Sequence, residues 1–224
     1  MNKHELKQKI SEAAAKRAAV NKYFSIASLA VKSGVKESEI RELFKTRNEI
    51  LEYYYESRIS AYRELQEKIN DYSEFSLSEK LSNLFLTLIE LLSEDKIFVE
   101  KTYSQLVAKK IYCESGLRRE IISELDQIFS DDKQISTASK PFLNKYSFNL
   151  IYAQFHGLVW FWLSDESPHQ ENTLALIDKW SAVIEEICYS KITDKSFDLL
   201  KFLAYNSPLK NLSIQRFKCT SSTT

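Results

Sequence analysis

The stretch that decides the fold is SGVKESEIRELFKTR, residues 33–47. Before it lies a short apolar-periodic segment that Ser25 can cap, and within it Ile40 and Phe44 recur at the spacing of one helix face. Gly34 stands where a glycine can take the left-handed conformation that ends many helices. The pattern predicts two short helices joined by a tight glycine turn, which is a helix-turn-helix.

The rest of the chain also predicts helices. Only three of the 224 residues are Gly and three are Pro, which leaves little material for loops and turns. Strand-type alternation is absent over any useful length. We therefore expect an all-α fold, with an N-terminal three-helix helix-turn-helix domain over residues 1–50. A long helix should join it to a larger helical domain over residues 51–224.

Helical spacing of apolar residues also gives approximate boundaries. A polar loop is expected at residues 130–140, and Pro168 should interrupt the chain between two later helices. The predicted helices cover about 3–19, 25–33, 37–44, a long one from 46, 77–92, 95–112, 117–129, 141–164, 171–191 and 194–206. Within the eighth of these, FHGLVWFWL (155–163) is apolar all round, so we expect both of its faces to be buried.

The zero net charge of the chain conceals an uneven distribution. Residues 1–50 hold 11 Lys/Arg and 6 Asp/Glu, a balance of +5, and the remainder carries the compensating −5. A basic N-terminal region on an acidic body is typical of a protein that meets a polyanion at one end.

The sequence favours a cytoplasmic location. The three cysteines show no CxxC spacing and are odd in number, which favours neither a zinc site nor a disulfide framework. The N-terminal residues lack the apolar core of a signal peptide. The longest apolar run is about half the length that a membrane-spanning helix needs, so no membrane association is expected.

A resemblance to a known family is carried by SLAVKSGVKESEIRELFKTRNEIL, residues 28–51. The positions of Gly34, Phe44 and the Thr46-Arg47 pair resemble, without a gap, the N-terminal domain of the TetR family of bacterial transcriptional regulators. FWLSDESPHQENTLALIDKW (161–180) is similar, less specifically, to a segment of some TetR-family C-terminal domains. The resemblance implies a homodimer that binds a DNA operator and whose larger domain binds an effector and dimerises.

Four positions depart from the family pattern. Val20 replaces a common glycine, and Lys36 replaces the Ser or Thr that usually caps the recognition helix. Arg41 stands where an aromatic residue often meets a phosphate, and Arg47 replaces a lysine. Both arginines can bind phosphate through the guanidinium group, so the fold is expected to persist while the details of DNA contact change.

The glutamates of the expected recognition helix have two interpretations. With Lys36 as the N-cap, Glu37 and Glu39 lie in the first turn, where the helix dipole stabilises acids. Glu37 also precedes Arg41 by four residues, the favourable order for an ion pair. Alternatively, Glu37 can accept a hydrogen bond from cytosine N4 in the major groove.

The cations around this helix are the expected phosphate contacts, with an ordinary solvated basic face as the alternative. The DNA-binding residues predicted from the pattern and the resemblance are Ser25, Lys36, Glu37, Ser38, Arg41, Lys45, Thr46 and Arg47.

Two further sets of residues are expected in the larger domain, and for both the alternative is an ordinary hydrophobic core. An effector pocket, implied by the resemblance, would be lined by Phe98, Tyr103, Tyr152, Phe155 and His156. Buried aromatic residues suit a subunit interface, and the helices at 141–164 and 171–191 carry Trp160, Trp162 and Trp180 for a four-helix dimer contact. A two-fold dimer would set two DNA-binding heads about one DNA turn apart.

No pattern indicates catalysis, a metal site or a cofactor. His4, His156 and His169 are far apart in sequence, and no Gly-rich phosphate loop or nucleophile elbow occurs. We therefore expect a ligand-responsive, homodimeric transcriptional regulator, most simply a repressor, that acts on a pseudo-palindromic operator in response to a small apolar or aromatic effector. The alternative is a TetR-like fold that binds a lipid or small molecule without sequence-specific DNA binding.

Overall fold

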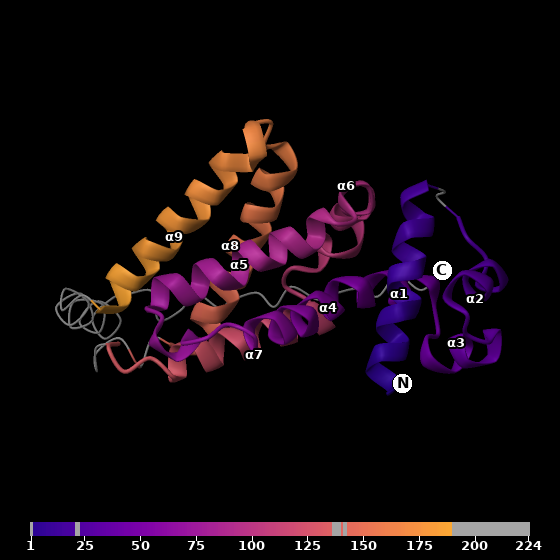
Figure 1. Ribbon diagram of the computed structural model, residues 1–224, viewed down its shortest axis with the longest axis horizontal. Helices are drawn as coiled ribbons and strands as arrows, with labels where there is room; N and C mark the ends of the chain where they lie inside the picture. Colours follow the sequence, from indigo (N-terminus) through magenta and orange to yellow (C-terminus); the bar gives the residue numbers. More distant parts are fainter. Residues whose placement is uncertain (1, 21–22, 136–139, 141–142, 190–224) are drawn as a thin grey trace, which may run out of the picture.

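The computed structural model describes residues 2–20, 23–135, 140 and 143–189. The described residues form an all-helical protein, which confirms the predicted fold class (Figure 1). The helices are α1 (Lys3–Val20), α2 (Ile26–Ser33), α3 (Glu37–Leu43), α4 (Arg47–Gln66), α5 (Leu77–Ser93), α6 (Lys96–Leu106), α7 (Gly116–Ser130), α8 (Lys145–Ser164) and α9 (Glu171–Tyr189). Short 3₁₀ turns are η1 (Tyr72–Glu74), η2 (Ala108–Lys110) and η4 (Pro168–Gln170). The helix expected at 194–206 lies outside the described residues.

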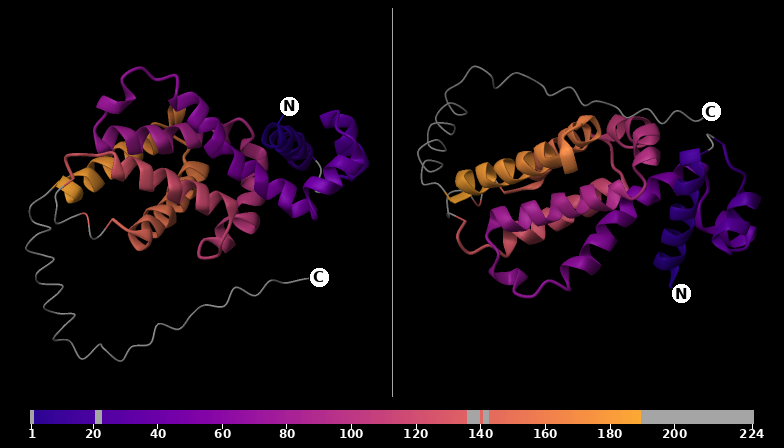
Figure 2. Two further views of the ribbon diagram at one scale, coloured as in Figure 1. Left: turned by 90° about the horizontal axis from the view of Figure 1, so that it is seen from below. Right: turned by 45° about the horizontal axis from the view of Figure 1, so that its top comes forward.

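Helices α1, α2 and α3 form a head at one end of the elongated molecule (Figures 1 and 2). Ile10, Ala14, Leu29 and Ile40 are buried between these helices and the start of α4. Burying side chains of this size is the main stabilising contribution to so small a unit, at roughly 1.5–3 kcal/mol for each large aliphatic residue.

Local capping fixes the boundaries inside the head. The Ser25 hydroxyl accepts a hydrogen bond from the Ser28 amide at 3.0 Å, and Gly34 ends α2 at φ 67°. The Thr46 hydroxyl accepts from the Glu49 amide at 3.1 Å and begins α4. These contacts are the ones that the sequence predicted, because each depends only on neighbours in the chain.

Helix α4 runs without a break from the head into the body, where it packs on α5 and α7. At its C-terminal end Arg63 donates to Glu124 at 2.7 Å and to Glu120 at 2.9 Å, which ties α4 to α7. Head and body therefore share one continuous helix.

The body consists of α5 to α9 and the C-terminal part of α4. Helix α5 packs along α9, and α7 packs against α4 and α8. A capping box begins α5, because Ser76 and Glu79 each accept a hydrogen bond from the other's backbone amide. The expected helix at 95–112 is shorter than predicted: α6 ends at Leu106 and η2 follows.

Asp165 organises the corner between α8 and α9. Its carboxylate accepts hydrogen bonds from the amide and hydroxyl groups of Ser167 and Thr173. These donors, chiefly the two hydroxyls, hold the pKa of the Asp165 carboxyl well below its usual range. Trp162 completes the corner, because its indole N–H donates to Gln170 at 2.8 Å.

Within the single chain FHGLVWFWL is buried on one side only, because Trp160 and Phe161 keep 47% and 42% of their surface exposed, so burial of its second face would need a partner subunit. Cys188 is a free, buried thiol.

Candidate functional site

The outer face of α3 projects from the end of the head. Ile40 faces inward, while Glu37, Ser38, Arg41 and Glu42 are all exposed. The outer face of α3 is therefore polar and exposed. It is accessible to a large partner, such as a nucleic acid whose groove could receive the helix.

The glutamates make the structural contacts expected of them. The Glu39 carboxylate accepts from the Lys36 amide at 3.3 Å, which is the half of a capping box that a lysine N-cap permits, since an ammonium group cannot accept. Glu37 and Arg41 lie 3.7 Å apart as an exposed i,i+4 ion pair. A pair of this kind contributes only a few tenths of a kcal/mol, so Arg41 can exchange it for another anion at little cost.

The residues expected to bind phosphate differ in how exposed they are to a ligand. Lys36, Arg41 and Lys45 are exposed around α3, and Ser25 and Thr46 act as N-caps. Arg47 differs, because it is half-buried and its guanidinium carbon lies 4.2 Å from the ring centroid of Phe24.

Two features of this surface were missed by sequence reasoning. The ammonium group of Lys9 lies 3.9 Å from the position that a Cβ on Gly34 would occupy, so α1 adds a cation beside the turn. Tyr23 is exposed, and its ring centroid lies 5.2 Å from the guanidinium carbon of Arg47. Neither contact has a signal in the local sequence, since both join segments that the fold brings together.

The aromatic residues expected to line an effector pocket do gather in the body. Tyr103, Tyr152 and Phe155 each contact His156, with ring centroids 5.6, 4.5 and 6.0 Å away. Phe98 lies one ring further off, stacked on Tyr55 at 5.6 Å. All five predicted residues are buried, and Tyr55, whose ring centroid lies 5.8 Å from that of Tyr103, links Phe98 to the other four in a connected aromatic interior.

His156 is neutral within this interior. Burial lowers its pKa to about 4, because a charged imidazolium would lose its hydration there. The Tyr103 hydroxyl lies 2.6 Å from His156 Nδ1, and burial raises the pKa of that hydroxyl well above its ordinary value. On the other side of the ring, Nε2 is buried and has no hydrogen-bond partner among the described residues.

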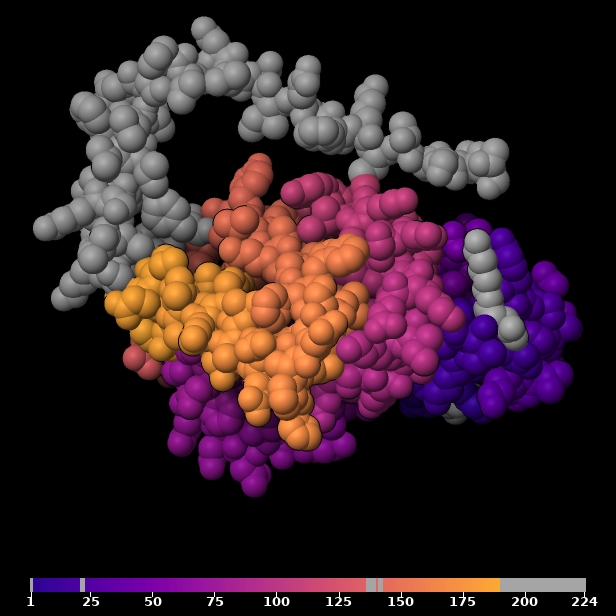
Figure 3. Space-filling view, turned by 90° about the horizontal axis from the view of Figure 1, so that it is seen from above, coloured from indigo at the N-terminus to yellow at the C-terminus, as the bar shows by residue number. Residues whose placement is uncertain are grey.

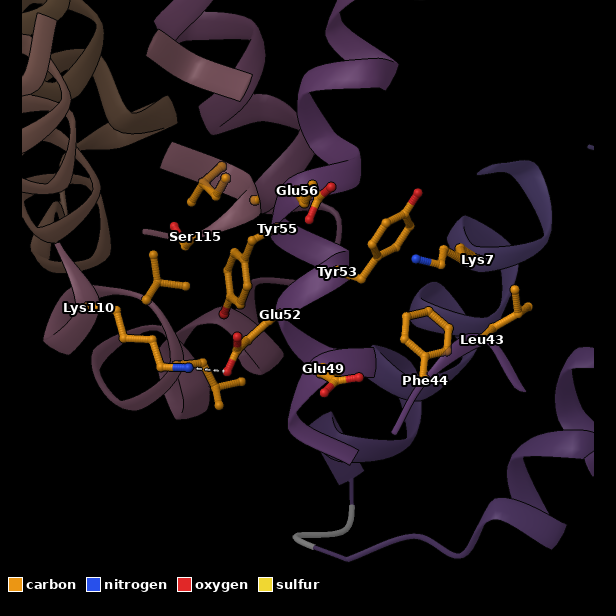
Figure 4. Close-up of a pocket in the computed structure, with 14 residues that line it drawn as sticks. Lys7, Leu43, Phe44, Glu49, Glu52, Tyr53, Tyr55, Glu56, Lys110 and Ser115 are labelled. Atoms are coloured by element: carbon orange, nitrogen blue, oxygen red, sulfur yellow. Dashed lines mark hydrogen bonds and ion pairs between the residues drawn. The ribbon is translucent and has the colours of Figure 1, made fainter. Parts of the chain in front are cut away.

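Cavities open at the junction of head and body. One, of about 190 Å³, lies between α4 and the start of α7, with Glu49, Glu52 and Glu56 along its α4 wall (Figure 4). Lys110 closes one side through an ion pair with Glu52 at 2.6 Å. A second, of about 570 Å³, lies between α1, α4 and α6. Both cavities are bounded by elements that connect head and body.

Helices α8 and α9 lie on one face of the molecule (Figure 3), and several of their large apolar side chains are exposed there. Gly157 lies within it, and a Cβ added there would meet no atom within 4 Å. Of the predicted interface residues, Trp160 is exposed on this face and Trp180 is half-buried. Trp162 does not fit the expectation, because it is fully buried within one chain at the α8–α9 corner. The other large apolar residues exposed on these helices are Tyr146, Leu150, Phe161, Leu174, Val183 and Ile187.

The described residues lack two further kinds of feature. They contain no group of three His, Cys, Asp or Glu side chains placed to hold a metal ion. None of their helices is long and apolar enough to cross a membrane.

Comparison with known proteins identifies a matching family and similar solved structures. Residues 80–203, more than half of it, match the family described as tetracyclin repressor-like, C-terminal domain. The fold is similar to that of the TetR transcriptional regulator from Nitrosomonas europaea ATCC 19718, with a TM-score of 0.55 and 15% identity over 79% of this chain and 96% of that one. A proposed fatty acid metabolism regulator from Clostridium perfringens gives a TM-score of 0.44 and 20% identity over 76% and 94% of the two chains. No curated protein matches the sequence.

Proposed function

Since this chain belongs to the TetR family of transcriptional regulators, we propose that it is a ligand-responsive repressor that binds a pseudo-palindromic operator as a homodimer in the cytoplasm. The observation that carries the proposal is the exposed outer face of α3, flanked by Lys36, Arg41 and Lys45. A short helix with cations at both ends can lie in a major groove while those cations meet the flanking phosphates. Such regulators normally carry out no catalysis.

The homodimer would form through the outer face of α8 and α9. Trp160 is part of a face of large exposed apolar residues, and monomeric proteins rarely leave so many together. A two-fold contact between these helices would bury that face and repeat the head on both subunits. Residues 1–50 would then act as the DNA-binding domain and residues 51–224 as the effector and dimerisation domain.

The effector would bind in the aromatic interior around His156, among Tyr103, Tyr152 and Phe155, with Phe98 behind them. The two conformations of the dimer would differ in the distance between the two DNA-binding heads. A ligand that binds one conformation more tightly than the other shifts the population toward that conformation. By thermodynamic reciprocity, operator DNA would weaken effector binding by the same factor.

One observation favours the alternative function, a ligand-binding protein of this fold without sequence-specific DNA binding. Glu37, Glu39 and Glu42 are exposed on α3, and Arg47 is withdrawn against Phe24. These features lower the positive potential that a phosphate backbone would meet.

Fluorescence anisotropy with DNA from upstream of the protein's own gene, across a salt series, separates the two functions. Arg41→Ala and Lys45→Ala should each remove one phosphate contact per head. In a dimer this loss flattens the slope of log K against log salt by about 1.8, twice the value of about 0.9 for a single contact. The matched control is Lys68→Ala, an equal charge change on an exposed lysine past the end of α4. Weak, sequence-independent binding that neither head variant alters would favour the alternative.

A further inference from the structure

The end of the body away from the head holds a cavity of about 510 Å³. It is bounded by the connection from α4 to α5, the start of α5, and the end of α7 with the residues that follow it, and these segments meet at one end of the molecule (Figure 1). Among the described residues that line it, none belongs to the head or to the aromatic interior around His156. The cavity is therefore separate from both sites discussed above.

Lys80 on α5 is a buried cation that faces this cavity. The residue is only 6% exposed, and its ammonium group lies 6.0 Å from the ring centroid of Tyr72, which also lines the cavity. Among the described residues, no acceptor makes a hydrogen bond or an ion pair with this ammonium. Buried lysines are normally paired, because an ammonium group loses hydration that a distant aromatic ring replaces only in part. Lys80 thus presents an unmet positive charge to the cavity.

The buried carboxylates of the cavity are already bound to other donors. Glu124 accepts a hydrogen bond from Arg63 Nε at 2.7 Å. Asp132 accepts through both oxygens, from a backbone amide at 2.7 Å and from the Tyr189 hydroxyl at 2.6 Å. Either carboxylate would have to break these bonds in order to reach Lys80. The cavity therefore suits a ligand that brings its own anionic group.

The exposed residues of the cavity carry an excess of the opposite charge. Glu74 on η1 and Asp131 after α7 both line it, and neither carboxylate is paired with a described cation. The exposed Lys133 balances only one of them. A ligand with several negative charges would be repelled by these carboxylates, whereas an amino group would be attracted. The charges therefore favour a molecule that has one carboxylate and one ammonium group.

We propose that this cavity binds a free α-amino acid as its zwitterion, with the carboxylate on the Lys80 ammonium and the α-ammonium group toward Glu74 and Asp131. The bond to Lys80 would be charge-assisted, which makes it about twice as strong as a bond between neutral groups. The side chain of the amino acid would lie on Tyr72 and Phe75, whose ring centroids are 5.4 Å apart. The bound molecule would join the α4–α5 connection to the end of α7, as a second small-molecule site of the protein.

Three probes of matched shape test the ligand class by calorimetry on the full chain. They are L-leucine, 4-methylpentanoate, which lacks the amino group, and 3-methylbutylamine, which lacks the carboxylate. Leucine should bind at least about tenfold more tightly than either analogue, the equivalent of about 1.4 kcal/mol for the charged contact that each analogue loses. Leucine that binds no better than 4-methylpentanoate, or that does not bind at tens of millimolar, would overturn the proposal.

Three variants locate the site. Lys80→Met should weaken the binding of leucine and 4-methylpentanoate about tenfold and spare 3-methylbutylamine. Asp131→Asn, at an exposed residue, should weaken leucine and 3-methylbutylamine without weakening 4-methylpentanoate. The matched control is Lys109→Met, at an exposed lysine of η2, and should leave all three affinities unchanged.

Carbon-13 spectra of the unaltered protein give the same answer without a variant, because leucine should shift the side-chain resonances of Lys80. Leucine binding that persists in Lys80→Met, or that leaves the Lys80 resonances unshifted, would refute the site. No DNA is present in these measurements, so their outcome is independent of operator binding.

Discussion

Replacing Gly157 by alanine should change the stability of one subunit and the affinity of the dimer in opposite directions. A Cβ at this position meets no atom within 4 Å in the single chain, so the added methyl group causes no clash there. Glycine inside a helix is less favourable than alanine by about 0.5–1 kcal/mol because it loses more backbone entropy on folding. The variant subunit should therefore be more stable by that amount.

The proposed dimer should respond in the other direction. Gly157 lies on the apolar outer face of α8, where a glycine allows a second helix to approach closely. An additional methyl group in a closely packed contact costs about 1–3 kcal/mol. That cost corresponds to a dissociation constant raised about fivefold to more than a hundredfold.

Two measurements separate these effects. Urea unfolding of dilute protein reports the stability of the subunit, and sedimentation equilibrium reports the dimer. Glu64→Ala, an exposed change on α4, serves as the control and should alter neither quantity by more than about 0.5 kcal/mol. A Gly157→Ala dimer as tight as the original, or tighter, would refute the role of α8 in the contact.

Three other changes have defined outcomes. Thr46→Ala should cost about 1 kcal/mol in urea unfolding, because the Glu49 amide loses its cap. Thr173→Val keeps the shape of a buried side chain but removes a hydroxyl that lies 2.6 Å from the Asp165 carboxylate, so a loss of about 1–2 kcal/mol is expected, and an unchanged urea midpoint would contradict it. Lowering the pH from 7 to 4.5 should destabilise the protein by about 2–3 kcal/mol through His156, whose folded pKa of about 4 lies below its unfolded value, so the unfolded state binds more protons in this range. The uncharged side chains of Tyr103 and Tyr152 face that imidazole, and His156→Phe should reduce the pH dependence.

Features that depend on neighbours along the chain were predictable from the sequence. The caps at Ser25 and Thr46, the turn at Gly34 and the Glu37–Arg41 pair all lie within four residues of their partners. Helix boundaries in the head follow from the same local rules. The helix-turn-helix could therefore be predicted almost completely.

Features that depend on distant parts of the chain were not predictable. The apolar pattern of α8 does not show which of its faces packs within its own chain and which could pack on another chain. The sequence therefore could not predict that Trp162 is buried while Trp160 is exposed. The cation–π contact between Arg47 and Phe24 could not be predicted, because it depends on how α4 packs against the start of α2. The Asp165 corner did have a signal, since an aspartate before Ser167 and Thr173 is typical of a helix start.

The tryptophans are confined to one part of the molecule, so their fluorescence can be observed separately from that of the tyrosines. All three tryptophans of the sequence are in α8 and α9, whereas the head and α4 carry tyrosine as their aromatic emitter. Emission excited at the red edge of absorption therefore comes from α8 and α9 alone. The emission of Trp160 should change when the subunits separate. The emission of fully buried Trp162 should stay constant until the α8–α9 corner unfolds. The native protein thus carries an intrinsic fluorophore for its assembly that does not report on the head.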